Sequence, residues 1–130
     1  MKQYHPRSLA YLGDALYELW IREWMLEKTQ DSEALHKQTV AFVRAETQAK
    51  VLTAIEAHLT EAEKDLARRS RNVITTPKGR KIGQKDYRDA SALEALIGYC
   101  YYETPERIDV IKKTILKHLE SLNLLADSPL

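Results

Sequence analysis

Two acidic residues in distant parts of the chain have the character of metal ligands. Glu94 is the single charged side chain in an apolar or small segment from Ala90 to Tyr102, and Asp14 directly follows a glycine in the segment Leu9–Trp24. A carboxylate on a buried helix is costly unless it is paired or bound to a metal. Carboxylate oxygens, completed by water and phosphate, are ligands that Mg2+ accepts. If the two segments cross at these acids, Asp14 and Glu94 form a Mg2+ site.

Glycines next to the two acids favour such a crossing. Gly98 stands in the middle of the expected helix Tyr87–Tyr102, on the face that carries Glu94. Glycine there costs about 1 kcal/mol relative to alanine, and it leaves room beside the carboxylate. Gly13 interrupts the first apolar segment in the same way. We therefore expect two buried helices that each carry one acid beside one mid-helix glycine.

The remaining pattern predicts an all-α fold of one domain spanning residues 1–130. Apolar residues at helical spacing place one stripe on the first helix, made by Leu9, Leu12, Leu16, Leu19 and Trp20. The first half of the chain is expected to form a helix over 8–28 capped by Ser8, a turn with Asp31 or Ser32 as the next cap, and two helices over 33–59 with a bend near Val43 or Arg44. A further helix is opened by a Thr60 and Glu63 capping box and ends near Arg71, and a loop over 72–85 with an extended piece at 73–76 follows it. The Tyr87–Tyr102 helix comes next, then a last helix capped by Thr104 with Pro105 at its first position, and a frayed tail over 123–130.

Composition excludes several classes of protein. The chain lacks an apolar run near 18 residues, so we expect no membrane span or membrane partner. Its N-terminal residues lack the apolar core of a signal peptide, which favours the cytoplasm. The single cysteine, Cys100, supports no disulfide, and the four histidines lack zinc-ligand spacing.

Positive charge is concentrated in one region. Residues 64–88 contain nine Lys and Arg against two acids, whereas the whole chain has a net charge of only +1. Such asymmetry suggests an anionic partner, and a long basic loop in a compact domain is typically functional or disordered. The candidate nucleic-acid contacts are Arg68, Arg71, Asn72, Lys78, Arg80, Lys81, Lys85 and Arg88. Binding through them should weaken steeply with salt.

The segments around the two acids resemble conserved segments of ribonuclease III catalytic domains. LAYLGDALYELWIR contains the GDA motif, and SALEALIGYCYY contains the EALIG motif. Further similar segments are LHKQTVAFVRAETQA, RSRN, TTPKG and DYR. Together they cover most of the chain, from about residue 8 to 116, and the chain resembles the Mini-ribonuclease III family, which has this catalytic domain without a separate double-stranded-RNA-binding domain.

This resemblance implies an all-helical homodimer that cleaves double-stranded RNA with Mg2+, or with Mn2+ as a substitute. It implies that Asp14 is the catalytic aspartate and Glu94 the metal-binding glutamate. In-line attack by water would leave 5′-phosphate and 3′-hydroxyl ends, and the family role is maturation of the 23S rRNA precursor. Full-length ribonuclease III has further acids where this chain has Arg7, Ala10 and Ser91. The short family also lacks these carboxylates. Without them, phosphate oxygens and water would have to supply more of the metal ligands than in a tightly held two-metal site.

Other interpretations of the same residues stay open. Each acid, taken alone, also fits a structural ion pair or an ordinary margin of an apolar stripe, and the basic segment also fits a solvated surface. The sequence is thus compatible with three classes of protein. These are a Mg2+-dependent endoribonuclease, a catalytically silent ribonuclease III-like domain that binds RNA or the ribosome, and a helical dimer with a protein partner.

Overall fold

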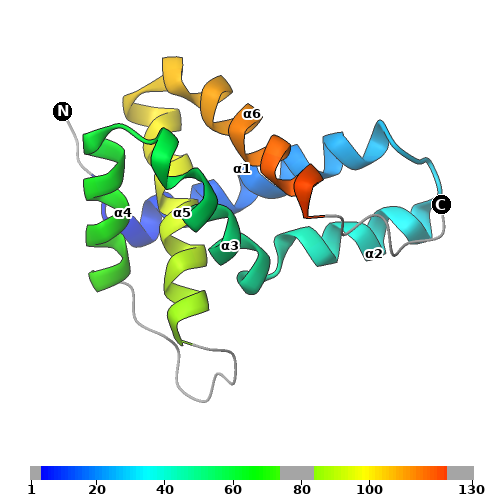
Figure 1. Cartoon of the computed structure of the whole chain (residues 1–130), viewed down its shortest axis with the longest axis horizontal. Helices are drawn as coiled ribbons and strands as arrows, with labels where there is room; N and C mark the ends of the chain where they lie inside the picture. Colours follow the sequence, from blue (N-terminus) through cyan, green and yellow to red (C-terminus); the bar gives the residue numbers. More distant parts are fainter. Residues whose placement is uncertain (1–3, 74–83, 123–130) are drawn as a thin grey trace.

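The computed structural model describes residues 4–73 and 84–122, and every regular element within them is helical (Figure 1). The elements are α1 (Pro6–Leu26), α2 (Ser32–Val43), α3 (Ala45–Ile55), the short 3-10 helix η1 (Glu56–His58), α4 (Glu61–Val73), α5 (Gln84–Glu103) and α6 (Pro105–Ser121). The predicted all-α fold is confirmed. The predicted loop over 72–85 is wrong at both ends, because residues 72–73 belong to α4 and residues 84–85 to α5. The extended piece predicted over 73–76 is therefore wrong at Val73, and its other residues and the predicted tail lie outside the described residues. Within the described part, no helix is long and apolar enough to cross a membrane.

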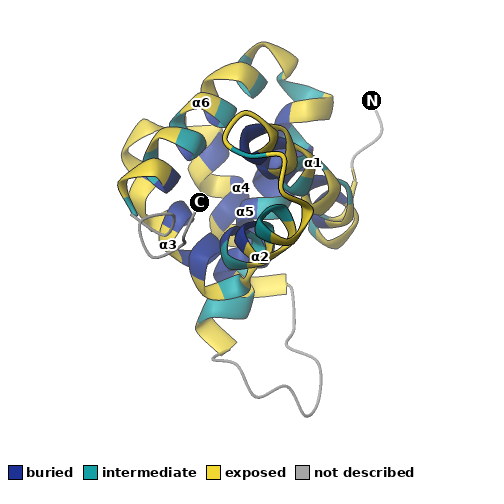
Figure 2. Cartoon of the chain, turned by 90° about the vertical axis from the view of Figure 1, so that its right-hand side faces the viewer, coloured by how far each residue is buried: buried dark blue, intermediate teal, exposed yellow. Residues whose placement is uncertain are grey.

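Helix α5 is the centre of the fold. It packs against α1, α3, α4 and α6, and its contact with α1 is the most extensive in the molecule (Figure 1). Its buried residues include the consecutive runs 90–93 and 95–98, so every side of the helix is covered. Figure 2 shows the buried residues gathered inside the surrounding helices. The prediction of a helix enclosed on all sides is confirmed.

Two glycines set the distance between α1 and α5. A Cβ atom placed on Gly13 would lie 1.7 Å from the carbonyl oxygen of Glu94. A Cβ atom on Gly98 would lie 2.2 Å from the carbonyl oxygen of Leu9. The backbone of each helix therefore occupies the space where the other helix would carry a side chain. This reciprocal contact places residue 13 of α1 directly against residue 94 of α5.

The buried face of α1 differs from the predicted stripe. Leu9 and Trp20 are buried as expected, but Leu19 is 52% exposed. The fully buried side chain at the centre of the face is Tyr17, which lies one turn beyond Gly13. Because the glycine must face α5, the helix is rotated so that Leu19 points away from the core.

The first helix also begins earlier than predicted, and Ser8 is not its cap. His5 occupies the N-cap position, where its ring Nδ1 accepts a hydrogen bond of 3.0 Å from the Arg7 N–H. Pro6 follows at the first helical position, where its fixed φ suits a helix and its missing N–H costs nothing. Ser8 therefore lies inside the first turn.

Several other predicted caps are observed, whereas α5 begins three residues before the predicted Tyr87. Asp31 accepts a hydrogen bond of 3.1 Å from the Ala34 N–H and caps α2. Thr60 and Glu63 form the expected reciprocal capping box, with bonds of 2.9 and 3.2 Å. Arg44, with ψ of 154°, is extended and separates α2 from α3 as predicted. Thr104 occupies the N-cap of α6, although its side chain makes no capping hydrogen bond.

Replacing Gly13 with alanine tests the helix crossing. Helix propensity alone predicts that Gly13→Ala stabilises the protein by about 1 kcal/mol. The contact with the Glu94 carbonyl predicts the opposite sign, a loss of about 2 kcal/mol or more, because rigid backbone must move away from the new methyl group. Urea unfolding of the two proteins measures the difference. A stabilised variant would contradict the crossing.

Candidate active site

The side chains of Asp14 and Glu94 meet where α1 crosses α5. They come from helices that lie far apart in sequence, and their carboxyl groups are within hydrogen-bonding distance of each other. Asp14 is exposed in the single chain, whereas Glu94 is half-buried. The predicted convergence of the two acids is therefore observed. Asp14 lines an open groove on α1, so its carboxyl is open to solvent.

Burial and the neighbouring carboxyl change the acidity of Glu94. Desolvation is the main cause that raises its pKa to about 8, and the charge and hydrogen bond of Asp14 add to it. The side chain of Gln48 acts in the opposite direction and lowers the pKa. At neutral pH without a cation, Glu94 therefore carries a proton and donates it to Asp14 in a hydrogen bond. A bound divalent cation replaces such a proton.

The end of α2 is hydrogen-bonded to side chains that lie beside this site. Its last carbonyl groups have no partner within the helix, as in any helix end. Side chains from α1 and α3 supply the missing donors. The Tyr17 hydroxyl donates to the Phe42 carbonyl at 2.7 Å, and the Gln48 amide donates to the Val43 carbonyl at 2.8 Å. Thr47 donates to the Ala41 carbonyl at 2.8 Å.

Two of these donors also border Glu94. Gln48 touches its carboxyl, and burial together with the charge of Glu94 raises the pKa of the Tyr17 hydroxyl far above its ordinary value. Both side chains are buried, with exposures of 0% for Tyr17 and 3% for Gln48. The break between α2 and α3 and the surroundings of Glu94 are thus built from the same residues.

The oxygen atoms present fit one hydrated divalent cation. Asp14 and Glu94 offer carboxylate oxygens. Gln48, whose side chain hydrogen-bonds Glu94, has a buried Oε1 without a hydrogen-bond partner among the described residues. Ala10 and Ser91, at the positions of further acids in the full-length enzyme, are buried here. The described part of the chain holds no group of three His, Cys, Asp or Glu residues arranged to share a metal. Water and phosphate would therefore supply the remaining ligands.

The predicted nucleic-acid contacts fall into three groups. Lys78, Arg80 and Lys81 lie outside the described residues. Arg68, Asn72, Lys85 and Arg88 are exposed near the facing ends of α4 and α5. Of these, Arg68 pairs with Asp65, and the Lys85 Nζ lies 2.6 Å from the Asp89 carboxylate. Contact with nucleic acid stays a prediction for every residue of the set.

Arg71 has a different place from its basic neighbours. It is half-buried and bonded to the carboxylates of Asp89 at 2.7 Å and Glu56 at 2.8 Å. The Asp89 side chain is only 5% exposed, so removing its partners would leave a buried charge. Arg71 therefore ties the end of α4 to the start of α5 and holds the ends of the basic loop.

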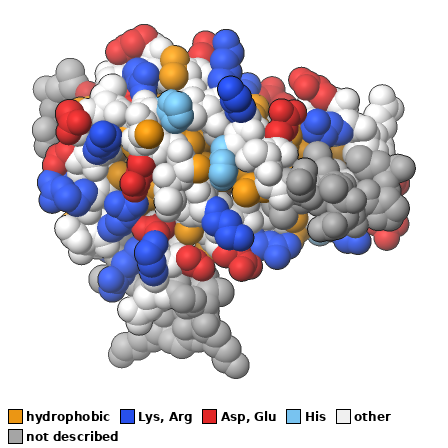
Figure 3. Space-filling view, in the orientation of Figure 1, with side chains coloured by type: hydrophobic (Ala, Val, Ile, Leu, Met, Phe, Trp, Pro, Cys, Tyr) orange, Lys and Arg blue, Asp and Glu red, His pale blue; other side chains and the backbone are white. Residues whose placement is uncertain are grey.

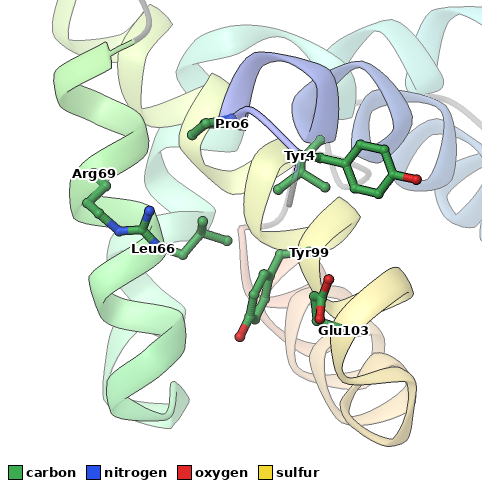
Figure 4. A pocket seen from close by; sticks show the side chains of 7 residues that line it. Tyr4, Pro6, Leu66, Arg69, Tyr99 and Glu103 are labelled. Carbon is green, nitrogen blue, oxygen red and sulfur yellow. The ribbon is translucent and has the colours of Figure 1, made fainter. Parts of the chain in front are cut away.

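A separate cavity of about 280 Å3 lies between the start of α1, α4 and the end of α5 (Figure 4). Its lining combines apolar and aromatic side chains with Arg69 and Glu103. Tyr4, which is part of the lining, stacks on Tyr102 with ring centroids 5.1 Å apart. Neither Asp14 nor Glu94 borders this cavity, so it is distinct from the candidate active site.

Sequence reasoning missed two residues beside Glu94. Gln48 stands three, four and seven positions before Val51, Leu52 and Ile55, which form the buried face of α3. A polar residue on an apolar face is the signal that would have singled it out. Tyr17 stands three residues after Asp14 in the sequence, but its hydrogen bond to the end of α2 depends on the tertiary fold.

Comparison with known proteins gives one consistent result. The family model of the ribonuclease III domain matches residues 7–105. The chain is 41% identical over 120 residues to the Mini-ribonuclease 3 of Thermosynechococcus vestitus, covering 92% of this chain and 78% of the relative. It is 36% identical over 123 residues to the Mini-ribonuclease 3 of Clostridium tetani, with coverages of 92% and 82%. A crystal structure of a protein from Fusobacterium nucleatum is similar with a TM-score of 0.80 and 34% identity, covering 93% and 96% of the two chains.

The raised pKa of Glu94 predicts how stability depends on pH. Between its ordinary value of 4.5 and about 8, the folded protein holds a proton that the unfolded chain has lost. Rising pH over this range therefore destabilises the metal-free protein. Glu94→Gln lacks this titration and should gain stability relative to the parent between pH 5 and pH 8, by on the order of 1 kcal/mol or more.

Urea unfolding with a chelator at both pH values measures this difference. Adding Mg2+ at pH 8 should stabilise the parent but not the variant. A difference between the two proteins that does not change with pH would contradict the raised pKa of the Glu94 carboxyl.

Proposed function

The chain belongs to the ribonuclease III family and is an endoribonuclease, and we propose that it hydrolyses double-stranded RNA at Asp14 and Glu94 with Mg2+. Mn2+ would serve as a substitute. The observation that carries the proposal is the meeting of these two carboxyls at the α1–α5 crossing, inside the region that matches the family model. Family membership also favours a nuclease over a silent RNA-binding domain or a protein-binding dimer.

The roles of the residues follow from their surroundings. When bound, a divalent cation supplies Lewis-acid chemistry, lowering the pKa of water and offsetting charge on the phosphate. Asp14, which is exposed, would hold that cation on the side open to RNA, and half-buried Glu94 would hold it from the side of the core. Attack by water on phosphorus breaks the bond to the 3′ oxygen and leaves 5′-phosphate and 3′-hydroxyl ends.

Exposed basic side chains bind the RNA. A-form duplexes are recognised by shape, through phosphates and 2′-hydroxyl groups. Figure 3 shows Lys and Arg side chains over α4 and beside the start of α5, interspersed with acidic ones. We assign phosphate contacts to Arg68, Asn72, Lys85 and Arg88 and to the loop residues Lys78, Arg80 and Lys81. Arg71 contributes to this surface indirectly, through its ion pairs with Glu56 and Asp89.

The exposed face of α1 supports the proposed homodimer. Tyr11, Leu19 and Leu26 are 86%, 52% and 59% exposed, and with Ala15 and Arg22 between them they follow one another at helical spacing. Open grooves of about 450 and 330 Å3 run along this face. Apolar residues aligned in this way are typical of an interaction site. Asp14 borders the larger groove, so a second copy would flank the active site.

The 23S rRNA precursor is the proposed natural substrate. The family role implied by the sequence and the Mini-ribonuclease 3 relatives support this choice. A transcript carrying the paired ends of the precursor should be cut at discrete positions and in preference to an unrelated duplex of equal length. Equal cleavage of both would argue against the assignment.

A charge change on α1 tests the dimer. Leu19→Lys should shift the protein from dimer to monomer in sedimentation experiments, because the lysine would lie in the interface while costing little in the exposed single chain. The matched control is Val110→Lys on α6, where an apolar residue is 44% exposed away from this face. A parent protein that sediments as a monomer, or a dimer unaffected by Leu19→Lys, would refute the interface.

A cleavage assay tests the catalytic assignment. With long duplex RNA and Mg2+, Asp14→Asn and Glu94→Gln should each reduce the rate at least about 100-fold, because each removes charge that stabilises the transition state. Glu23→Gln is the matched control, since it makes the same kind of change at an exposed site of α1 that pairs with Lys112. Salt-sensitive binding by the parent without cleavage would instead support a silent RNA-binding domain.

A further inference from the structure

Gln48 is a polar residue at a buried, apolar position of α3. It is 3% exposed and lies on the face formed by Leu52 and Ile55, where a leucine would fill the space. Burying an amide costs about 1–3 kcal/mol unless hydrogen bonds compensate for the lost water. A glutamine at this position is therefore explained by what its amide binds.

The Gln48 side chain is bonded to two different helices. Its amide nitrogen donates a hydrogen bond to the Val43 carbonyl at 2.8 Å, which fixes the nitrogen against the end of α2. The Gln48 side chain also hydrogen-bonds the carboxyl of Glu94 on α5. A donor fixed on one side and bonded to a carboxylate on the other restricts where that carboxylate lies. The anchoring carbonyl is itself held in place, because Tyr17 bonds the preceding carbonyl of Phe42.

The oxygen of the Gln48 amide is unpaired, in contrast to its nitrogen. This Oε1 atom is buried and has no hydrogen-bond partner within the described residues. Buried acceptors in folded proteins are nearly always satisfied. An unsatisfied oxygen on a side chain that hydrogen-bonds the Glu94 carboxyl is available to a donor that arrives with a ligand, such as water in the shell of a divalent cation.

From this geometry we propose that Gln48 is a positioning residue of the active site, which fixes the Glu94 carboxyl between α3 and α5 for the divalent cation. The inference rests on the proposed function, because it assumes that Asp14 and Glu94 bind the cation. Gln48 does not act on RNA itself. Partners that orient metal ligands in this way typically change metal affinity or activity 10- to 100-fold when removed.

Thr47 provides a matched control for the structural role of Gln48. It is the preceding residue on α3, is also buried, and also donates a hydrogen bond of 2.8 Å to the end of α2. Gln48→Met and Thr47→Val each remove one such bond while nearly preserving volume. Only the first removes the donor to Glu94.

Mn2+ binding to the full chain without RNA provides a readout separate from activity. Free Mn2+ is measured by electron paramagnetic resonance during titration of the parent and the variants. Both variants should lose similar thermal stability, but Gln48→Met should bind Mn2+ at least about 10-fold more weakly than Thr47→Val. In duplex-RNA cleavage, its kcat should fall by a similar factor with KM unchanged.

Three outcomes separate the possibilities. Mn2+ affinity of Gln48→Met within twofold of Thr47→Val overturns the positioning role and leaves the proposed function intact. A parent whose Mn2+ binding is unaffected by Asp14→Asn overturns both. If Gln48→Met does not fold, Gln48→Asn retains the polar amide but is one methylene too short to bond both partners. It should show the same loss of Mn2+ affinity, and parental affinity would again overturn the proposal.

Discussion

The close crossing of α1 and α5 is the constraint on which the rest of the structure depends. Each helix presents a glycine to the backbone of the other, Gly13 to Glu94 and Gly98 to Leu9. No side chain larger than hydrogen fits at either point without moving a helix. The crossing brings the carboxyls of Asp14 and Glu94 together, although both are acids and repel each other when ionised. Packing of α3, α4 and α6 around α5 holds this unfavourable pair in place.

The helix break after α2 and the candidate active site share residues. Three successive carbonyl groups at the end of α2 accept hydrogen bonds from side chains of α1 and α3. Two of those donors, Tyr17 and Gln48, also border Glu94. The same side chains therefore satisfy the end of α2 and border the carboxyl that we propose as a metal ligand.

Much of this arrangement is predictable from the sequence because it depends on local rules. The capping box at Thr60, the break at Arg44 and the enclosed helix around Glu94 follow from residue type and spacing. The rotation of α1 does not, since the apolar residues of that helix outnumber those its core face accepts, and Leu19 is left outside. The ion pairs of Arg71 and the hydrogen bonds of Gln48 join residues whose proximity is decided only by tertiary packing.

The most direct measurement of the central claim is the position of a bound cation. Crystals grown with Mn2+ and recorded at a wavelength where manganese scatters anomalously would locate it without assumptions about the ligands. The account predicts an anomalous peak at the α1–α5 crossing, within coordination distance of carboxylate oxygens from both Asp14 and Glu94. A peak bound to one of the two acids with the other turned away, or manganese found only elsewhere on the surface, would contradict it.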